Sequence, residues 1–174
     1  MNKTIKLFLF CFPFLLLSCQ EKPKEHLLLT SDRPAQKYVS KDSTPELVNK
    51  KSYYIPAYSN LYYQTGASKV YFTVVLSLRN TSSHENIYFT KIDYYNSDGE
   101  LIRAYLEENL LIKPLGSAEF IVEFKERESG AGANFIVEYG TEKELINKPI
   151  IEAINMGYIG QQGFAFTSSA QLLN

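Results

Sequence analysis

The chain has 174 residues and a formal net charge of −1, so its charge gives no electrostatic basis for binding nucleic acid or an acidic surface. Two cysteines and two histidines are too few to build a metal or catalytic site of the usual kinds, and we expect no metal and no cofactor. Thirteen tyrosines and eleven phenylalanines, with no tryptophan, favour strands and supply polar-tipped rings for a sheet face or an interface.

The N-terminus has the pattern of a secretory signal, residues 1–18. Lys3 and Lys6 flank the start of an apolar stretch, residues 5–17, which is shorter than the roughly 20 residues that span a bilayer. Ser18 is small and Cys19 follows it directly. The segment resembles the lipobox of bacterial lipoproteins, which implies that Cys19 carries the lipid and begins the mature chain. A plain secretory signal with a free thiol at Cys19 is the alternative.

Lipid attachment has two consequences for the mature protein. Cys11 leaves with the signal and Cys19 is modified, so neither a disulfide nor a catalytic thiol remains. Gln20 follows the cysteine; by resemblance to lipoproteins of two-membraned bacteria, it implies passage to the outer membrane, with the leaflet left open. Residues 19–52 mix Glu, Lys, Pro, Ser and Asp with few aromatics, which predicts a flexible tether.

The first half of the folded part, predicted to cover residues 53–174, contains three clear strand patterns. Residues 53–58 are rich in strand formers. Residues 69–79 alternate, which places Val74 inside and Thr73 outside. Residues 87–95 alternate again after a turn at 80–84, and this pattern predicts that the odd-numbered side chains share one face throughout.

The second half begins with a hairpin signal, Asp98-Gly99, which suits a tight turn with positive φ. A return strand at 101–106 follows, then a turn at 114–117. In the strand at 119–124, alternation places Phe120, Val122 and Phe124 on one side. Further strands are predicted at 134–139 and 149–156, and in the tail, which contains Phe164 and Phe166.

These elements predict the fold class. Seven or eight short strands, frequent turn signals and no amphipathic helix favour an all-β, immunoglobulin-like antiparallel β-sandwich, as a single domain over residues 53–174. A small β-barrel is the alternative. Because the strands are short and the lipobox already supplies an anchor, a membrane barrel is disfavoured.

Several segments together resemble the bacterial "domain of unknown function 3124" family. They are Leu76–Thr81, Asp93–Tyr95 with Asp98-Gly99, Ser129–Glu138, Pro149–Ala153 and Gln161–Phe164. The resemblance covers roughly residues 53–169. It implies a small secreted or lipid-anchored protein of one domain in the cell envelope, with no established activity, and it supplies no chemistry.

Five residues in this region are candidates for binding. Arg79 ends a predicted buried strand, and Asp93 lies on the strand expected to pair with it, so the two either form an ion pair or are independent solvated charges. Asn134 is expected to bond the backbone where a strand begins. Gln161 and Gln162 either grip a sugar or peptide backbone or belong to a plain loop.

Other constellations have a structural interpretation that we favour. Asp93, Asn96 and Asp98 have the spacing of calcium ligands, but an Asx-stabilised turn explains them. The glycine-rich segment 129–134 resembles an anion-binding loop, but glycines that allow close packing explain it. Four strand carboxylates are more easily explained as outward-facing charges than as an acid–base pair: Glu119, Glu123, Glu138 and Glu152.

The sequence therefore predicts a non-enzymatic, lipid-anchored envelope protein, held to the membrane by lipid on Cys19, that acts as a binding or assembly module for a protein or glycan of the envelope. The alternative is a small-ligand or glycan binder, or a weak hydrolase that uses sheet carboxylates. A concave pocket with buried acids or an Arg–acid pair would favour that alternative. A flat aromatic patch would favour a protein partner.

Overall fold

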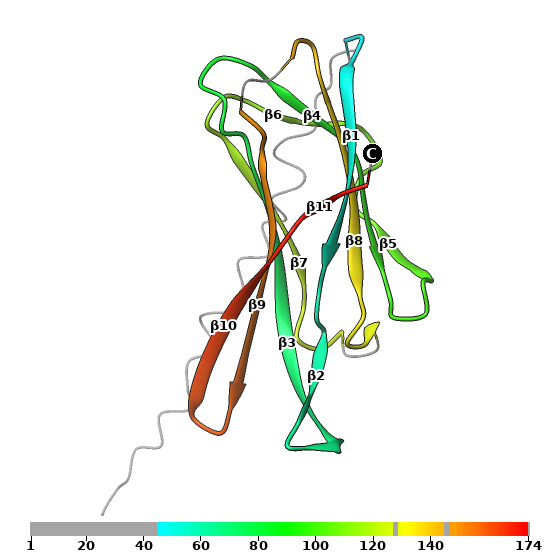
Figure 1. Cartoon of the computed structure of the whole chain (residues 1–174), viewed down its shortest axis with the longest axis vertical. Helices are drawn as coiled ribbons and strands as arrows, with labels where there is room; N and C mark the ends of the chain where they lie inside the picture. Colours follow the sequence, from blue (N-terminus) through cyan, green and yellow to red (C-terminus); the bar gives the residue numbers. More distant parts are fainter. Residues whose placement is uncertain (1–44, 127–128, 145–146, 174) are drawn as a thin grey trace, which may run out of the picture. The chain divides into compact units, whose positions relative to one another are not determined.

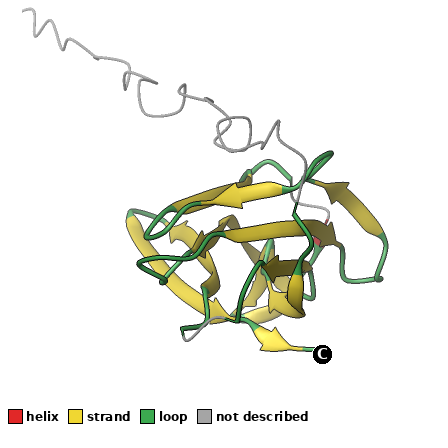
Figure 2. Cartoon of the chain, turned by 90° about the horizontal axis from the view of Figure 1, so that it is seen from above, coloured by secondary structure: helices red, strands yellow, loops and turns green. Residues whose placement is uncertain are grey.

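The computed structural model describes residues 45–126, 129–144 and 147–173. Eleven strands form two antiparallel sheets, and strands and loops make up nearly all of this region (Figure 2). Among the described residues no helix has the length and apolarity that crossing a membrane requires. The sheets do not close into a barrel, so the predicted all-β sandwich is confirmed.

The first sheet, called sheet 1, has the strand order β11-β1-β8-β4-β5, and β6 also pairs with β4 (Figure 1). Its strands are β1 (Val48–Pro56), β4 (Ile87–Tyr95), β5 (Leu101–Ala104), β6 (Leu110–Ile112), β8 (Asn134–Thr141) and β11 (Gln171–Leu172). β1 begins five residues before the strand expected at Tyr53, so the sheet includes the end of the predicted tether. The sequence patterns did not predict β11, which pairs with β1 opposite Tyr53 and Tyr54.

The second sheet, called sheet 2, has the strand order β10-β9-β3-β2, and β7 also pairs with β3. Its strands are β2 (Asn60–Tyr63), β3 (Thr65–Arg79), β7 (Ser117–Val122), β9 (Ile150–Ile159) and β10 (Gln162–Ser169). In β3 the predicted alternation is confirmed. Val74, Leu76 and Leu78 are fully buried, whereas Thr73 lies on the other face and is half-buried.

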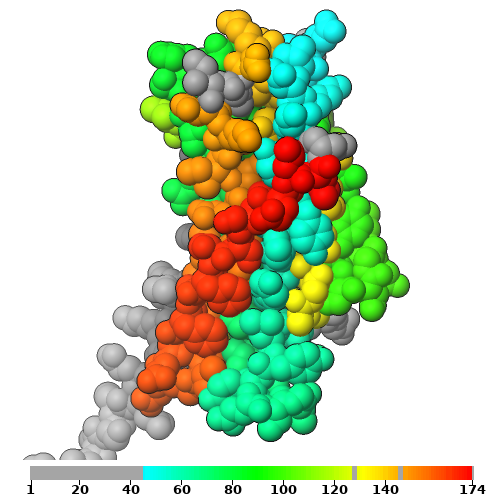
Figure 3. All heavy atoms as spheres, in the orientation of Figure 1, coloured from blue at the N-terminus to red at the C-terminus, as the bar shows by residue number. Residues whose placement is uncertain are grey.

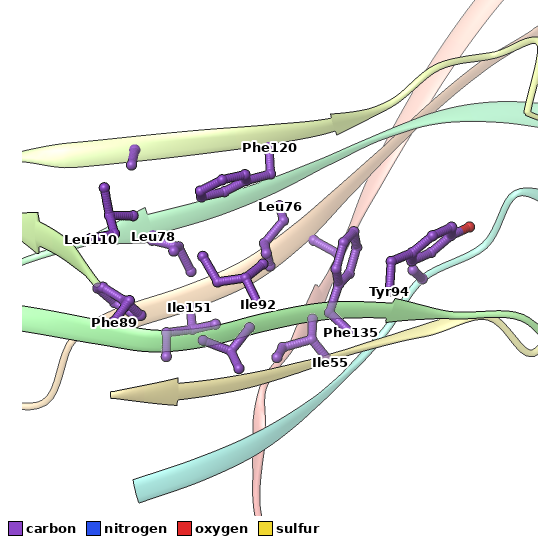
Figure 4. Close-up of a cluster of buried hydrophobic side chains, with 14 of the residues drawn as sticks. Ile55, Leu76, Leu78, Phe89, Ile92, Tyr94, Leu110, Phe120, Phe135 and Ile151 are labelled. Atoms are coloured by element: carbon purple, nitrogen blue, oxygen red, sulfur yellow. The ribbon is translucent and has the colours of Figure 1, made fainter. Parts of the chain in front are cut away.

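The core lies between the inner faces of the two sheets (Figure 4). Sheet 2 contributes the aliphatic row of β3 together with Phe120, and sheet 1 contributes rings such as Phe89 and Phe135. Burying a side chain of this size stabilises a fold by about 1.5–3 kcal/mol, so a stack of such residues is sufficient for a domain of this size without disulfides.

In β4 the predicted alternation is wrong after its first three residues. Ile87 and Phe89 face the core, but so do Ile92 and Tyr94, because the register with β8 shifts between Phe89 and Lys91. The extra residue of this β-bulge moves the following side chains to the opposite face. As a result Asp93 and Tyr95 point outward on sheet 1.

The hairpin between β4 and β5 forms where it was predicted, with a longer turn. The Gly99 N–H donates to the Asn96 carbonyl over 3.1 Å, so Ser97 and Asp98 are the central residues of the turn. Gly99 follows them with φ of +79°. This is the pattern of an ordinary turn followed by a left-handed glycine, rather than a two-residue Asp-Gly turn.

Candidate functional site

Arg79 and Asp93 do not pair, and the prediction that their strands are neighbours is wrong. Arg79 ends β3 in sheet 2, whereas β4 carries Asp93 in sheet 1. The loop between them crosses from one sheet to the other instead of closing a hairpin. Arg79 is exposed, and its Nε donates to Ser77 Oγ over 3.2 Å. Asp93 forms a contact of 3.6 Å with Lys91 Nζ instead.

The other candidates lie in two places. Asn134 begins β8 opposite Tyr95 of β4, and Asp93 lies two residues before Tyr95 on the same strand. Residues two apart on a strand point to the same side, so Asn134 and Asp93 share the outer face of sheet 1. Gln161 and Gln162 are exposed at the tip of the β9–β10 hairpin. The five residues therefore do not form one site. Cys19 lies outside the described residues.

Asn96 is committed to the turn and is not arranged as a cation ligand. Its Oδ1 accepts from the backbone N–H groups of Asp98 and Glu100 at 3.0 and 2.9 Å, and its Nδ2 donates to Glu100 Oε2 at 2.9 Å. Within the described residues no group of three or more His, Cys, Asp and Glu side chains could hold a metal ion. These contacts favour the Asx-stabilised turn over a calcium loop.

The glycine-rich loop 129–133 packs on the same turn. Ser97 Oγ donates to the Ser129 carbonyl at 3.1 Å and accepts from the Gly132 N–H at 2.8 Å. A Cβ on Gly130, whose φ is +85°, would lie 2.2 Å from Ser97 Oγ. The glycines are needed for this close approach, which supports the packing interpretation over an anion site.

A half-buried polar cluster lies between β5, an edge strand of sheet 1, and the end of β7 in sheet 2. Arg103 of β5 forms a 2.7 Å ion pair with Glu126, which follows β7, and Arg103 Nη1 also donates to the Tyr105 hydroxyl at 3.3 Å. Burial raises the pKa of Tyr105 to about 12, against the opposing effect of the Arg103 charge. The hydroxyl of Tyr105 donates to the Ile121 carbonyl at 3.3 Å. These contacts join the two sheets, and we interpret the cluster as stabilising the packing of one sheet on the other.

Of the four carboxylates considered above, two are brought onto one row. Glu119 of β7 and Glu152 of β9 lie on either side of Ser77 of β3, in register on the outer face of sheet 2. With strands about 4.8 Å apart, their Cα atoms are separated by roughly 10 Å. Glu138 belongs to sheet 1, and Glu123 lies beyond the end of β7. No sequence pattern indicated the Glu119–Glu152 row, because it depends on the register of three strands that are distant in sequence.

The outer face of sheet 2 is apolar next to this row. Val75 lies between Ile121 of β7 and Ile154 of β9, and the next row along the sheet contains Thr73 and Met156. Ile121 is 45% exposed and Met156 is 40% exposed. Side chains of this kind are normally found on the inner face of a sheet, so their gathering on the outer face marks this surface.

Aromatic rings continue this surface towards the β9–β10 hairpin. Phe124 stacks on Tyr158 with ring centroids 5.6 Å apart, and Tyr71 meets the edge of Phe124 at 6.3 Å. Tyr158 is 60% exposed. The prediction that Phe124 shares a side with Phe120 and Val122 is wrong, because β7 ends at Val122 and Phe124 lies in the turn that follows. We call the whole set the outer apolar face: Tyr71, Thr73, Val75, Ile121, Phe124, Ile154, Met156 and Tyr158.

Two open grooves lie elsewhere on the described domain. One, of about 460 Å³, has Leu47, Lys50 and Glu138 in its lining, and the other, of about 360 Å³, lies between β1 and β9 beside Glu152 and Leu172. Neither groove is lined by an arginine or by a buried acid. These two grooves therefore lack the buried acids and the Arg–acid pair that would favour the small-ligand or hydrolase alternative.

The family model described as "Protein of unknown function (DUF3124)" matches residues 50–173. The chain belongs to the DUF3124 family. A search of curated proteins found no match to this DUF3124 chain. Among solved structures it is similar to "Crystal Structure of Thermotoga maritima 1070", with 10% sequence identity and a TM-score of 0.41, over 70% of this chain and 92% of that one.

The outer apolar face of this DUF3124 domain is the main feature that sequence reasoning missed. One signal for it was present: residues 74–76, Val-Val-Leu, interrupt the alternation of β3 with an apolar residue on the outward side. The tyrosines of segment 53–63 are not part of this face. Of these, Tyr62 is 62% exposed at the hairpin of β2 and β3, whereas Tyr53 is half-buried against Tyr139.

Proposed function

We propose that this protein is a non-enzymatic binding module of the cell envelope that docks a protein partner on the outer apolar face of sheet 2. The observation that carries the proposal is the exposure of Ile121, Met156 and Tyr158 on one continuous sheet face. Apolar and aromatic side chains of this kind supply the buried centre of protein interfaces. The flatness of a sheet suits a partner with a large complementary surface better than a small ligand.

The anchoring part of the proposal rests on the sequence. The resemblance of the segment around Cys19 to a lipobox supports the lipid anchor, and the composition of residues 19–52 supports a tether between lipid and domain. By resemblance to lipoproteins of two-membraned bacteria, Gln20 after the cysteine supports an anchor in the outer membrane. A tethered module with an apolar face is suited to holding another envelope component close to the membrane, because tethering raises the effective concentration of the two surfaces.

Affinity purification after crosslinking in cells tests the proposal. The wild-type chain is compared with Thr73→Asp, which puts a charge in the middle of the outer apolar face, and with Ser83→Asp, a matched charge in an exposed turn. We expect wild type and Ser83→Asp to recover the same partner and Thr73→Asp to lose it. Equal recovery by all three variants would overturn the proposed surface.

The second candidate, a glycan binder or weak hydrolase, is favoured by the row of Glu119, Ser77 and Glu152. A separation of roughly 10 Å between backbones allows the two carboxyl groups to approach the 6.5–9.5 Å range of inverting glycosidases. Purified protein should then release reducing sugar from envelope glycans, and Glu119→Gln should abolish the release. Absence of both binding and release for wild type would exclude this candidate.

A further inference from the structure

The outer edge of β10 is unpaired along most of its length. β10 is the last strand of sheet 2 and pairs with β9 alone, and none of the strands in the described ranges lies on its other side. In Figure 3 its atoms form a continuous orange-red band on the viewed surface. An eight-residue edge without proline or charge is a ready template for another strand.

The backbone groups at this edge can be assigned from the pairing with β9. The two-residue turn Gly160-Gln161, in which Gly160 has φ of +60°, sets Ile159 opposite Gln162. At the other end, the Ala170 N–H donates to the Ile151 carbonyl over 3.2 Å. Hydrogen-bonded and non-hydrogen-bonded residues alternate along an antiparallel strand. The N–H and C=O groups of the even-numbered residues of β10 are therefore the ones that bond to β9.

It follows that the N–H and C=O groups of Gly163, Ala165 and Thr167 point away from the sheet. All three residues are exposed. They supply donors and acceptors at the spacing that a further antiparallel strand requires.

The other edges of the domain are protected. β5 has four residues, contains Arg103 and has a register shift against β4. β7 carries Glu119 in its middle, and β2 and β11 have four and two residues. Short length, charge and bulges are the means by which proteins prevent strand addition, and β10 has none of them.

We propose that β10 pairs antiparallel with β10 of a second copy of this chain, about a twofold axis at Ala165. In this register Ala165 lies opposite Ala165 of the other copy, and Gly163 lies opposite Thr167 of the other copy. Only small side chains therefore meet on the outer face. On the inner face Phe164 lies opposite Phe166 of the other copy. Phe164 is 37% exposed in the single chain and would gain an aromatic cross-strand neighbour in each copy.

A second copy suits this edge because the edge is self-complementary. Residues 161–174 contain no charged side chain, so antiparallel self-pairing brings no like charges together. Aromatic pairs at a non-hydrogen-bonded position place their side chains closest and contribute most. The pairing would join two copies of sheet 2 into one continuous sheet.

The test uses two differently tagged full-length copies expressed together, with co-purification as the readout. Wild-type copies should co-purify. Two copies of Ala165→Lys should co-purify about tenfold less, because the twofold axis places the two charges face to face. Ala165→Lys with Ala165→Glu should recover most of the wild-type level, and Ser83→Lys, a matched charge in an exposed turn, should behave as wild type.

Each other result overturns the inference. Wild-type copies that do not co-purify show that the chain does not self-associate. Copies of Ala165→Lys that still co-purify show a different interface, and recovery of a foreign protein that is lost in Ala165→Lys shows a different occupant. Recovery by the Lys/Glu combination also establishes that both variants fold. The result is independent of the lipid anchor and of the partner proposed for the outer apolar face, which Thr73→Asp tests separately.

Discussion

Val74→Asp should unfold the domain. Val74 is fully buried in the middle of β3, opposite Val122 and Asn155. Losing its burial costs about 1.5–3 kcal/mol, and an unpaired buried carboxylate adds several more. The total, about 5 kcal/mol or more, is comparable with the whole free energy of unfolding of a typical domain, about 5–15 kcal/mol.

No neighbour is available to pair with the new carboxylate. The nearest polar side chain in register is Asn155, which is fully buried. Its Oδ1 already accepts from the Tyr58 N–H at 3.0 Å, and its Nδ2 donates to Ser168 Oγ at 3.2 Å. A carboxylate could accept only from Nδ2, so recruiting Asn155 would break its hydrogen bond to Ser168 of β10 and would not relieve the cost.

Thr73→Asp is the matched control, because it places the same charge one residue away on the outer face. Its cost should stay within about 1 kcal/mol, as for most surface changes. Urea unfolding followed by circular dichroism and tyrosine fluorescence measures both variants. Equal unfolding midpoints for Val74→Asp and Thr73→Asp would refute the assignment of the two faces.

Four further predictions follow from single residues. Cys19→Ser should leave the fold intact and release the protein from membranes, and a serine variant that still sediments with salt-washed membranes would contradict the lipobox interpretation. Gly99→Val should lower the free energy of unfolding by about 1–3 kcal/mol because its φ is +79°, seen as a shifted urea midpoint. Gly130→Ala should also destabilise, through contact with Ser97 Oγ, and adding Ser97→Gly should restore part of the midpoint if that contact is the cause. Because burial raises the pKa of Tyr105 from 10 to about 12, the unfolded chain loses its proton first, and stability present below pH 10 should fall as pH rises towards 12. Tyr105→Phe should flatten that fall in urea midpoints compared at about pH 9 and 11.

Local patterns predicted the strands well where inward and outward side chains alternate without interruption. β3 alternates from Phe72 to Leu78 because one face is buried there, and these inward residues could be identified from the sequence. β4 could not be predicted to its end, because the bulge between Phe89 and Lys91 depends on pairing with β8. A single extra residue leaves no mark in composition, yet it moves Asp93 to the other face.

The candidate site was less predictable, because it depends on which strands are neighbours. Two strands joined by a short loop, β3 and β4, looked like a hairpin, but they belong to different sheets and Arg79 and Asp93 are separated. The rows that do form, such as Ile121–Val75–Ile154, join residues of β7, β3 and β9. Such neighbours are set by the topology of the sheet, which periodicity does not encode.

The position of β1 has a consequence for when the domain can fold. β1 lies between β8 and β11, and Tyr53 is opposite Leu172, which lies 119 residues further along the chain. The first strand of the domain therefore finds one of its two partners only after all the other described strands have been made. Folds dominated by such distant pairings form slowly, since loop closure must precede the contacts that reward it. The edge of β1 that pairs with β11 therefore stays open until the last described strand is available.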